Sequence, residues 1–389
     1  MPSPPPARFR QLFAYPFRAF FASAVLLALL AIPAWLAMLL AGWQPPTLLP
    51  GLYWHQHEML FGFLNAAIAG FLLTAVCVWT GTERLHGAPL LALWSVWAAG
   101  RLALLAGEVL PAWLAHGIDL AFVPLVMLDA GRRIWRARQH RQLVLMLVLG
   151  ALWLMDLGFH LQPGGPYARG AMLMAMLLML VIGGRITPAF SANWLRLNGA
   201  DPDAVRVLPW LERLTLLSVL ALLPLVLLRA PAALLAPAAL AAALISGARL
   251  ALWSGWLIRR EPLLWILHLS LAWIPLALTL LAASALGWVA PTAWLHAAGA
   301  GAMGSLILGV MSRVALGHTG RPLVLPPTIV WAFVAALLGA ALRVSAALHW
   351  LPWTLGVGAS AALWLLAYGL FALRYWRILA SPRFDGKPG

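Results

Sequence analysis

The sequence WHQHEM at positions 54–59 places two imidazoles, His55 and His57, and the carboxylate of Glu58 at the start of an apolar stretch. Ionisable groups are costly to hold in lipid, so their presence there favours a functional role. Neutral imidazole is the commonest metal ligand in proteins, which makes ligation of a metal ion or a haem iron the functional interpretation. The alternative is a histidine pair that only solvates the end of a helix.

Composition indicates a multi-pass membrane protein. Of 389 residues, 63% are hydrophobic and 10% are charged, and the mean hydropathy is +0.90. A soluble domain of this composition could not cover its surface with polar groups. Apolar runs of about 18 or more residues, enough to cross ~30 Å of hydrocarbon, recur along the chain. The predicted spans are 18–40, 58–78, 88–109, 113–130, 142–161, 169–190, 211–228, 233–257, 263–286, 293–314, 327–348 and 353–376. They predict an all-α fold with a single transmembrane domain over 1–389.

The basic residues predict the orientation of these spans. The net charge is +15, but the arginines gather on alternate connections instead of on one soluble face. Five of them, Arg132, Arg133, Arg136, Arg138 and Arg141, lie between the fourth and fifth spans. The positive-inside rule then predicts a cytoplasmic N-terminal segment, 1–17, and a cytoplasmic tail, 377–389. The first span is too long for a cleaved signal peptide and predicts a retained signal anchor. Topology therefore explains the charge, and no nucleic acid is expected as a partner.

The same topology places six of the ten histidines at the non-cytoplasmic ends of spans. They are His55, His57, His116, His160, His296 and His349. They come from five predicted helices, more than scattered solvation would usually give, so all six are candidate metal ligands. Cys77 is the only cysteine. This excludes a disulfide within the chain and a thiolate-rich or iron–sulfur site.

Buried charges are predicted near these histidines, with two interpretations. Asp119 and Asp156 fall inside spans, as do Arg101 and Arg343. Intramembrane ionisable groups must pair or face a polar cavity. The arginines could form salt bridges with the two aspartates that fix helix register. Alternatively, the arginines could hold haem propionates while the carboxylates orient ligating imidazoles through their second nitrogen.

Two segments of the chain resemble each other. The segment that begins at His57 aligns without gaps with the one that begins at His296, and a third, in the sixth span, shares an Ile-x-Gly step but has Ala171 in place of the histidine. Three spans, four helices apart, predict a threefold repeat of a four-helix unit. Such a repeat puts His57 and His296 at matched depth. We therefore predict them as axial ligands of a b-type haem, with His55 as the substitute for His57.

Three segments, WHQHEMLFGFLNAAIAGFLLTAV, IGGRITPAFSANWL and GAMGSLILGVMSRVALGHTGRPL, resemble the NnrS family across spans 2 to 10. The family pattern maps onto His55, His57, Glu58, Gly62, Gly70, Thr74, Trp79, Gly81, Gly184, Arg185, Thr187, Pro188, Trp194, Gly309, Arg313, Gly317, His318, Gly320 and Arg321. One departure follows span 2, where the family usually reads Ala-Val-Pro-Asn-Trp-Thr-Gly and this chain reads AVCVWTG. The missing proline and asparagine remove a kink and a polar side chain from this turn.

The resemblance implies a bacterial inner-membrane protein that contains haem and copper and is associated with nitric oxide. For copper we predict a site on the non-cytoplasmic side, because imidazole suits copper in either oxidation state. Its ligands are expected among His55, His116, His160 and His349. The methionines Met172, Met174, Met176 and Met179 could add a thioether, although plastic core packing is their commoner role.

The resemblance is densest near Arg185, Arg313 and His318, which are predicted at cytoplasmic helix ends. One interpretation is a helix end closed by Gly317, with the arginines as topology anchors. The other is a second polar site. There Arg185 and Arg313 would bind an anionic group such as a haem propionate, and His318 would ligate iron or copper or relay protons.

The sequence thus predicts a haem- and copper-binding membrane protein that helps cells to withstand or process nitric oxide. Its partners would be the lipid bilayer, nitric oxide and an unidentified redox partner, and an enzymatic role is left open. One alternative is a transporter for a small metabolite or metal, for which twelve helices and embedded charges are equally normal. Another is a sensor, or an assembly partner that passes haem or copper to a reductase.

Overall fold

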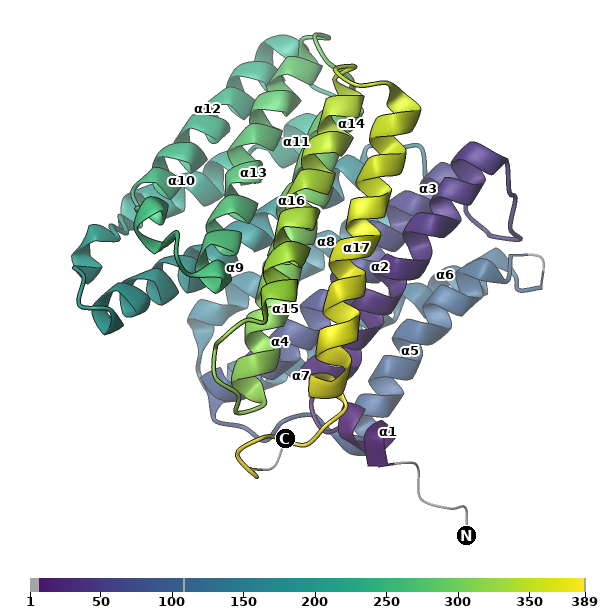
Figure 1. Ribbon diagram of the computed structural model, residues 1–389. Helices are drawn as coiled ribbons and strands as arrows, with labels where there is room; N and C mark the ends of the chain where they lie inside the picture. Colours follow the sequence, from purple (N-terminus) through teal and green to yellow (C-terminus); the bar gives the residue numbers. More distant parts are fainter. Residues whose placement is uncertain (1–6, 108, 388–389) are drawn as a thin grey trace. The chain divides into compact units, whose positions relative to one another are not determined.

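The computed structural model describes residues 7–107 and 109–387. Over these residues the chain is helical and contains no β-strand, as predicted (Figure 1). Within them, twelve helical segments are long and apolar enough to cross a membrane. Each corresponds to one of the predicted spans, so the chain is a multi-pass membrane protein. The segments are Pro16–Ala41, Gly51–Thr80, Gly87–Leu105, Ala112–Arg136, His140–Leu161, Tyr167–Leu197, Pro202–Leu227, Ala232–Ala251, Pro262–Ala285, Pro291–His318, Pro327–Ala347 and Trp353–Leu379.

Several spans are built from more than one element. A short helix, α1 (Ala7–Leu12), precedes the first span. The elements are then α2 (Pro16–Ala41), α3 (Gly51–His57), η1 (Glu58–Phe63), α4 (Leu64–Thr80), α5 (Gly87–Leu105), α6 (Ala112–Leu120), α7 (Phe122–Arg136), η2 (His140–Gln142), α8 (Leu143–Leu161), α9 (Tyr167–Leu197), η3 (Pro202–Ala204), α10 (Pro209–Leu220), α11 (Leu222–Leu227), α12 (Ala232–Ala251), η4 (Gly255–Ile258), α13 (Pro262–Ala285), α14 (Pro291–His296), η5 (Ala297–Gly304), α15 (Ser305–His318), α16 (Pro327–Ala347) and α17 (Trp353–Leu379).

The helices form two compact units. Unit 1 takes the described residues of 1–168, 311–324 and 368–389, and unit 2 takes 169–310 and 325–367. Unit 1 therefore contains α1 to α8 together with the ends of α15 and α17. The expectation of a single transmembrane domain over 1–389 stays a prediction.

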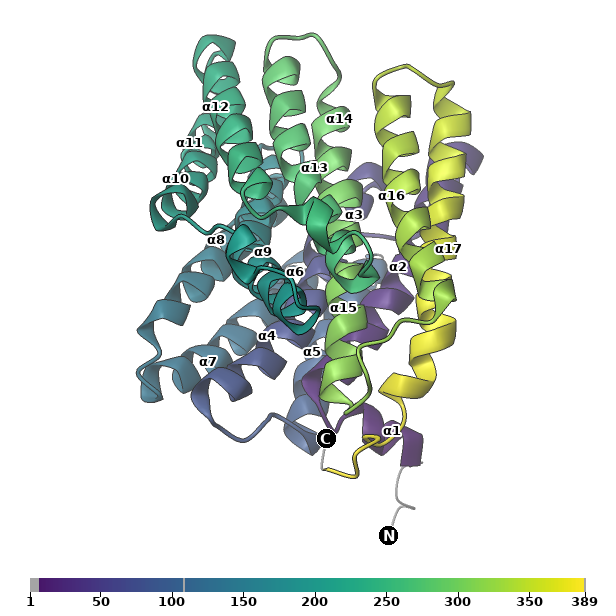
Figure 2. The same cartoon turned by 60° about the vertical axis from the view of Figure 1, so that its left-hand side comes forward.

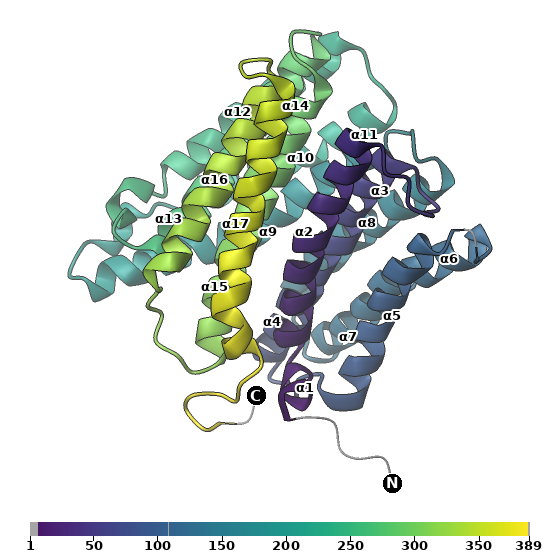
Figure 3. The same cartoon turned by 45° about the vertical axis from the view of Figure 1, so that its right-hand side comes forward.

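Small residues let the helices of unit 1 approach closely. The α2 and α4 helices pack together, and a Cβ at Gly70 of α4 would lie 2.7 Å from the Phe21 ring. The α5 and α6 helices lie side by side (Figure 3). A Cβ at Gly100 would come within 2.9 Å of the Asp119 backbone. Glycine at such an interface allows tight helix packing in lipid. The approach at Gly100 brings Asp119 into the interior of unit 1.

In unit 1 a buried arginine links the start of the first span to the end of the last span. Arg18 of α2 is fully buried. Its Nη1 atom donates hydrogen bonds to the carbonyl oxygens of Leu379, at 2.6 Å, and Ser381, at 2.7 Å. The last carbonyls of a helix lack intrahelical donors and carry a partial negative charge, so a cation is favourable there. The start of α2 therefore lies beside the end of α17.

The second and tenth spans share an unusual local structure. His57 is the last residue of α3 and His296 is the last residue of α14, and each is followed directly by a π-helix, η1 or η5. The π-helix is rare and often occurs at functional sites. Its occurrence at aligned positions supports the predicted repeat of four-helix units, which itself stays a prediction.

Unit 2 contains a buried ion pair. The α12 and α13 helices pack side by side (Figure 2). Arg249 of α12 donates from Nε to Oε1 of Glu212 at 2.7 Å and from Nη2 to Oε2 at 2.5 Å. Its guanidinium carbon also lies 4.7 Å from the centroid of the Trp253 ring. These contacts link α10 to α12.

We expect Glu212→Gln to lower the free energy of unfolding by up to about 3 kcal/mol, because it leaves the buried guanidinium of Arg249 without a charged partner. The Glu212 side chain is 22% exposed, so the loss falls at the low end for buried pairs. Thermal unfolding of the purified protein in detergent measures the change. Glu83→Gln is the control, because its side chain is 84% exposed. Equal loss in both variants would contradict the prediction.

Candidate metal centre

Four buried side chains of unit 1 converge at one point. His57 ends α3, Asp119 lies in α6, and Asp156 and His160 lie in α8. Because Asp156 and His160 are four residues apart, they share one face of α8. The four residues are between 0% and 7% exposed. The fold therefore holds two imidazoles and two carboxylates away from bulk water.

The donor atoms of this cluster are spaced as metal ligands would be. His57 Nε2 lies 3.2 Å from His160 Nε2, 3.1 Å from Asp119 Oδ2 and 3.2 Å from Asp156 Oδ1. His160 Nε2 lies 2.9 Å from Asp119 Oδ2 and 3.6 Å from Asp156 Oδ1. Four ligands at about 2.0–2.1 Å from a tetrahedral ion are separated by about 3.3–3.4 Å. These five separations lie on both sides of that value, and the donor atoms of the four residues all lie within 4.8 Å of one another, so they could hold one ion.

Carboxylates outnumber arginines around the cluster. Arg101 of α5 forms an ion pair with Asp119, and its Nη1 lies 3.5 Å from Glu58 Oε2. The three carboxylates of Glu58, Asp119 and Asp156 and the one guanidinium leave a formal charge of −2 when both imidazoles are neutral. Such a charge is expensive to bury. One divalent ion would neutralise it.

Several buried polar atoms in and around the cluster lack hydrogen-bond partners among the described residues. They include Asp156 Oδ1 and Glu58 Oε1, which lie 3.2 and 3.5 Å from His57 Nε2 and Nδ1 without hydrogen-bond geometry, and the Nδ1 atoms of His57 and His160. A buried polar atom without a partner costs free energy, and an ion or water at the site would remove that cost. Asp156 Oδ1 is also one of the atoms that lie near both imidazoles. The orphaned carboxylate oxygen therefore fits a metal ligand.

The structure brings some of the predicted histidines together. His57 and His160 belong to the cluster, and the ring of His116 packs against that of His160 with centroids 4.3 Å apart. His55, in contrast, stacks on Trp35 at 4.9 Å with an angle of 10° between the rings. His116 is partly exposed, so it lies between the cluster and the surface of unit 1.

The remaining predicted metal ligands lie in unit 2. His296 Nδ1 is 2.7 Å from the carbonyl oxygen of Thr292. His349 follows α16 with a φ of 60°. The four methionines of α9 are buried, as expected for core packing.

The four arginines predicted to hold haem propionates differ in their contacts and in the unit to which they belong. The salt-bridge interpretation is confirmed for Arg101, which pairs with Asp119. Arg343 lies near the end of α16 in unit 2, and its buried Nη1 atom has no hydrogen-bond partner among the described residues. Arg185 of α9 belongs to unit 2, whereas Arg313 of α15 belongs to unit 1. Their propionate role stays a prediction.

His318 lies in an aromatic setting in unit 1. Its ring centroid is 5.8 Å from that of Tyr15 and 5.9 Å from that of Phe17. The C-terminal tail covers the backbone here, since Arg383 Nη1 donates to the His318 carbonyl oxygen at 2.9 Å. The hydrogen bond from Arg383 lowers the pKa of Asp385 to about 2. Packing and tail docking account for this arrangement, and the predicted second polar site stays a prediction.

Sequence reasoning did not assign Asp119 and Asp156 as metal ligands. It placed them in spans and considered them only as partners of arginine or as groups that orient imidazoles. The spacing Asp-x-x-x-His at Asp156 and His160 was a usable signal, because positions i and i+4 share a helix face. The contribution of Asp119 depends on the packing of α5 against α6, which the sequence does not reveal.

A comparison with protein-family models matches nearly the whole chain to one family. A family model described as NnrS protein matches residues 11–383, which include all four residues of the cluster. The chain belongs to the NnrS family. The resemblance in the three sequence segments is thereby confirmed over nearly the whole length of the protein. No curated protein matches the sequence significantly.

Proposed function

We propose that this NnrS family protein binds a divalent transition-metal ion at His57, Asp119, Asp156 and His160 and acts in the bacterial inner membrane in the response to nitric oxide. The observation that carries the proposal is the convergence of four buried donor atoms, two from imidazoles and two from carboxylates. The resemblance to the family implies copper. The donors are imidazole and carboxylate without sulfur, a set that suits Cu(II), Zn(II) or Fe(II).

The surrounding residues would orient the ligands. Arg101 holds Asp119 through an ion pair. Glu58 Oε1 lies 3.5 Å from His57 Nδ1, and a small shift would let it accept a hydrogen bond from Nδ1 and leave Nε2 free to ligate. Burial in unit 1 excludes bulk water from the donor atoms. A copper or iron ion held by these four residues would supply a centre to which nitric oxide can bind only by taking a fifth coordination position.

The function is tested in membranes of cells that express the protein. Wild-type membranes are expected to remove nitric oxide, followed with a nitric oxide electrode, or to protect the cells from a nitric oxide donor. His160→Ala is expected to lose this effect, and His55→Ala to retain it, because His55 stacks on Trp35 outside the cluster. Full protection by a correctly inserted His160→Ala protein would refute the role of the cluster.

A second proposal concerns b-type haem with His57 and His296 as axial ligands. It is supported by the π-helix that follows each of these residues. In this conformation His57 Nε2 faces His160 and both aspartates, so ligation of haem by Nε2 of His57 would require it to leave the cluster.

A reduced-minus-oxidised spectrum of the purified protein separates the haem role of His57 from its role as a ligand of the metal ion. Haem loss in both alanine variants would support axial ligation, whereas loss in His296→Ala alone would assign His57 to the metal ion. A Soret band would also separate a haem protein from the alternative of a transporter.

We expect His116→Ala to lower the affinity for the metal ion by about tenfold, the low end of the range for groups that support a ligand. The His116 ring packs on the ring of His160 and would fix its orientation. Competition with a chromogenic chelator measures the affinity. His140→Ala in η2 is the control, since His140 packs on Trp135 and not on the cluster. An unchanged affinity in His116→Ala would show that His116 plays no supporting role.

A further inference from the structure

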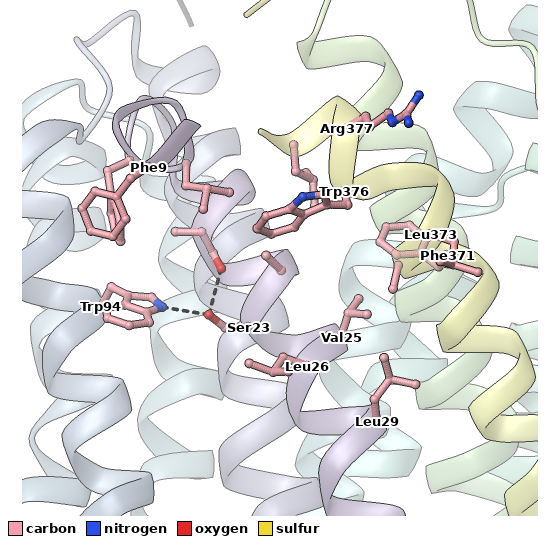
Figure 4. A pocket seen from close by; sticks show the side chains of 16 residues that line it. Phe9, Ser23, Val25, Leu26, Leu29, Trp94, Phe371, Leu373, Trp376 and Arg377 are labelled. Atoms are coloured by element: carbon pink, nitrogen blue, oxygen red, sulfur yellow. Dashed lines mark hydrogen bonds between the residues drawn. The ribbon is translucent and has the colours of Figure 1, made fainter. Parts of the chain in front are cut away.

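Unit 1 carries an apolar groove of about 590 Å³, far larger than a single side chain. Residues of α1, α2 and α17 line it, together with Trp94 of α5 (Figure 4). Leu26 and Leu373 lie at this groove and are exposed, so in a membrane they would face lipid. The groove is separate from the metal cluster, and none of the cluster residues lines it.

The length of the groove matches one leaflet of a bilayer. Its lining on α2 runs from Ala19 to Leu29, a separation of about 15 Å at the rise of an α-helix. This is half the ~30 Å thickness of the hydrocarbon core. Ala19 lies near the start of the first span, so the groove begins at one membrane boundary and extends toward the middle. A single acyl chain has this orientation and depth.

The polar side chains inside the groove bond to each other. Trp94 Nε1 donates to Ser23 Oγ at 2.8 Å, and Ser23 Oγ donates to the Ala19 carbonyl oxygen at 2.9 Å (Figure 4). Because these groups are already satisfied, the interior suits a hydrocarbon chain better than the carbonyl oxygens of a quinone ring, which would need a donor.

The rim of the groove is cationic and aromatic. Trp376 and Arg377, near the end of α17, line the rim, and α1 exposes Arg8 and Arg10 on either side of the lining residue Phe9. The sequence has no acidic residue before Glu58 or between Glu261 and Asp385. Trp is typical of the interfacial region, and arginine there attracts anionic lipid headgroups.

We propose that this groove binds an anionic phospholipid. One acyl chain lies along α2 between α17 and Trp94, and the phosphate contacts Arg377. The matched depth, the satisfied polar interior and the arginines at the rim support this occupant together. The site requires neither the metal ion nor haem.

The test is lipid binding to the purified, delipidated protein by native mass spectrometry. Phosphatidylglycerol and phosphatidylcholine with identical chains are compared. Wild type is expected to bind phosphatidylglycerol at least about fivefold more tightly, the effect of one arginine at a membrane surface. Arg377→Gln is expected to remove this preference, and Arg260→Gln, an exposed arginine of unit 2, to retain it.

A second variant tests the groove itself. Ala22→Trp fills the groove and is expected to weaken binding of both lipids, whereas Ala241→Trp on an exposed position of α12 is expected to leave it unchanged. Equal binding of the two lipids by wild type would overturn the proposal. So would a benzoquinone with an isoprenoid tail that displaces the lipid and binds Arg377→Gln as tightly as wild type.

Discussion

Replacing His57 by alanine is expected to reduce the affinity for the divalent ion by at least about a hundredfold, more than the loss of a group that only supports a ligand. His57 Nε2 lies within 3.2 Å of one donor atom from each of His160, Asp119 and Asp156. The substitution leaves a gap in the ligand set that no other imidazole fills in this conformation. Metal content after purification and competition with a chelator give the change in affinity.

His55→Ala is the matched control, because His55 lies two residues away on the same helix and stacks on Trp35. It is expected to keep the affinity of wild type. The metal assignment would be wrong if His57→Ala retained the ion, or if the two variants lost it equally. Circular dichroism of both proteins separates loss of the ligand from loss of the fold.

The second large effect is expected when the buried guanidinium of Arg101 is removed. Arg101→Gln would leave the carboxylates of Glu58, Asp119 and Asp156 without their guanidinium partner. Breaking a buried pair in this way typically costs about 3–5 kcal/mol of stability. The formal charge of the metal-free cluster would become −3, so a divalent ion should bind the folded variant more strongly than wild type and restore part of its stability. Thermal unfolding with and without the ion measures both effects.

A compensating change tests the charge argument. Arg101→Gln combined with Glu58→Gln restores the formal charge of −2 and removes the carboxylate that Arg101 contacted besides Asp119. The double variant is expected to recover a substantial part of the lost stability relative to Arg101→Gln alone. If the double variant were no more stable than the single variant, packing of the arginine and not charge balance would explain its role.

Local sequence patterns were sufficient to predict the membrane spans. A span needs only a continuous apolar stretch of sufficient length, and this property is visible without knowledge of the packing. The helix ends differ from the predicted span ends where polar residues continue a helix. For example, α7 extends to Arg136, whereas the predicted span ended at residue 130. The arginines there lie at the polar end of the span, where hydropathy falls although the helix continues.

The metal cluster could not be predicted from local sequence patterns, because it depends on contacts between residues far apart in the chain. His57 and His160 were recognised because histidines at span ends are unusual, but their meeting with Asp119 requires three separate helices to pack together. The approach of α6 to α5 at Gly100 is one such condition, and it follows from shape and not from composition. The separation of His57 and His55 has the same cause. Their side chains leave α3 in different directions, one toward α8 and the other toward Trp35 of α2.

X-ray absorption spectroscopy of the purified protein, at the edge of whichever metal it retains, tests the central claim most directly. We expect one ion per chain with nitrogen and oxygen ligands at about 2.0–2.1 Å and the multiple scattering of two imidazoles. Asp156→Asn should alter this first shell, because Asp156 Oδ1 lies within 3.6 Å of both imidazole Nε2 atoms. A sulfur shell at about 2.3 Å, or a wild-type protein that retains no ion after loading, would contradict the account.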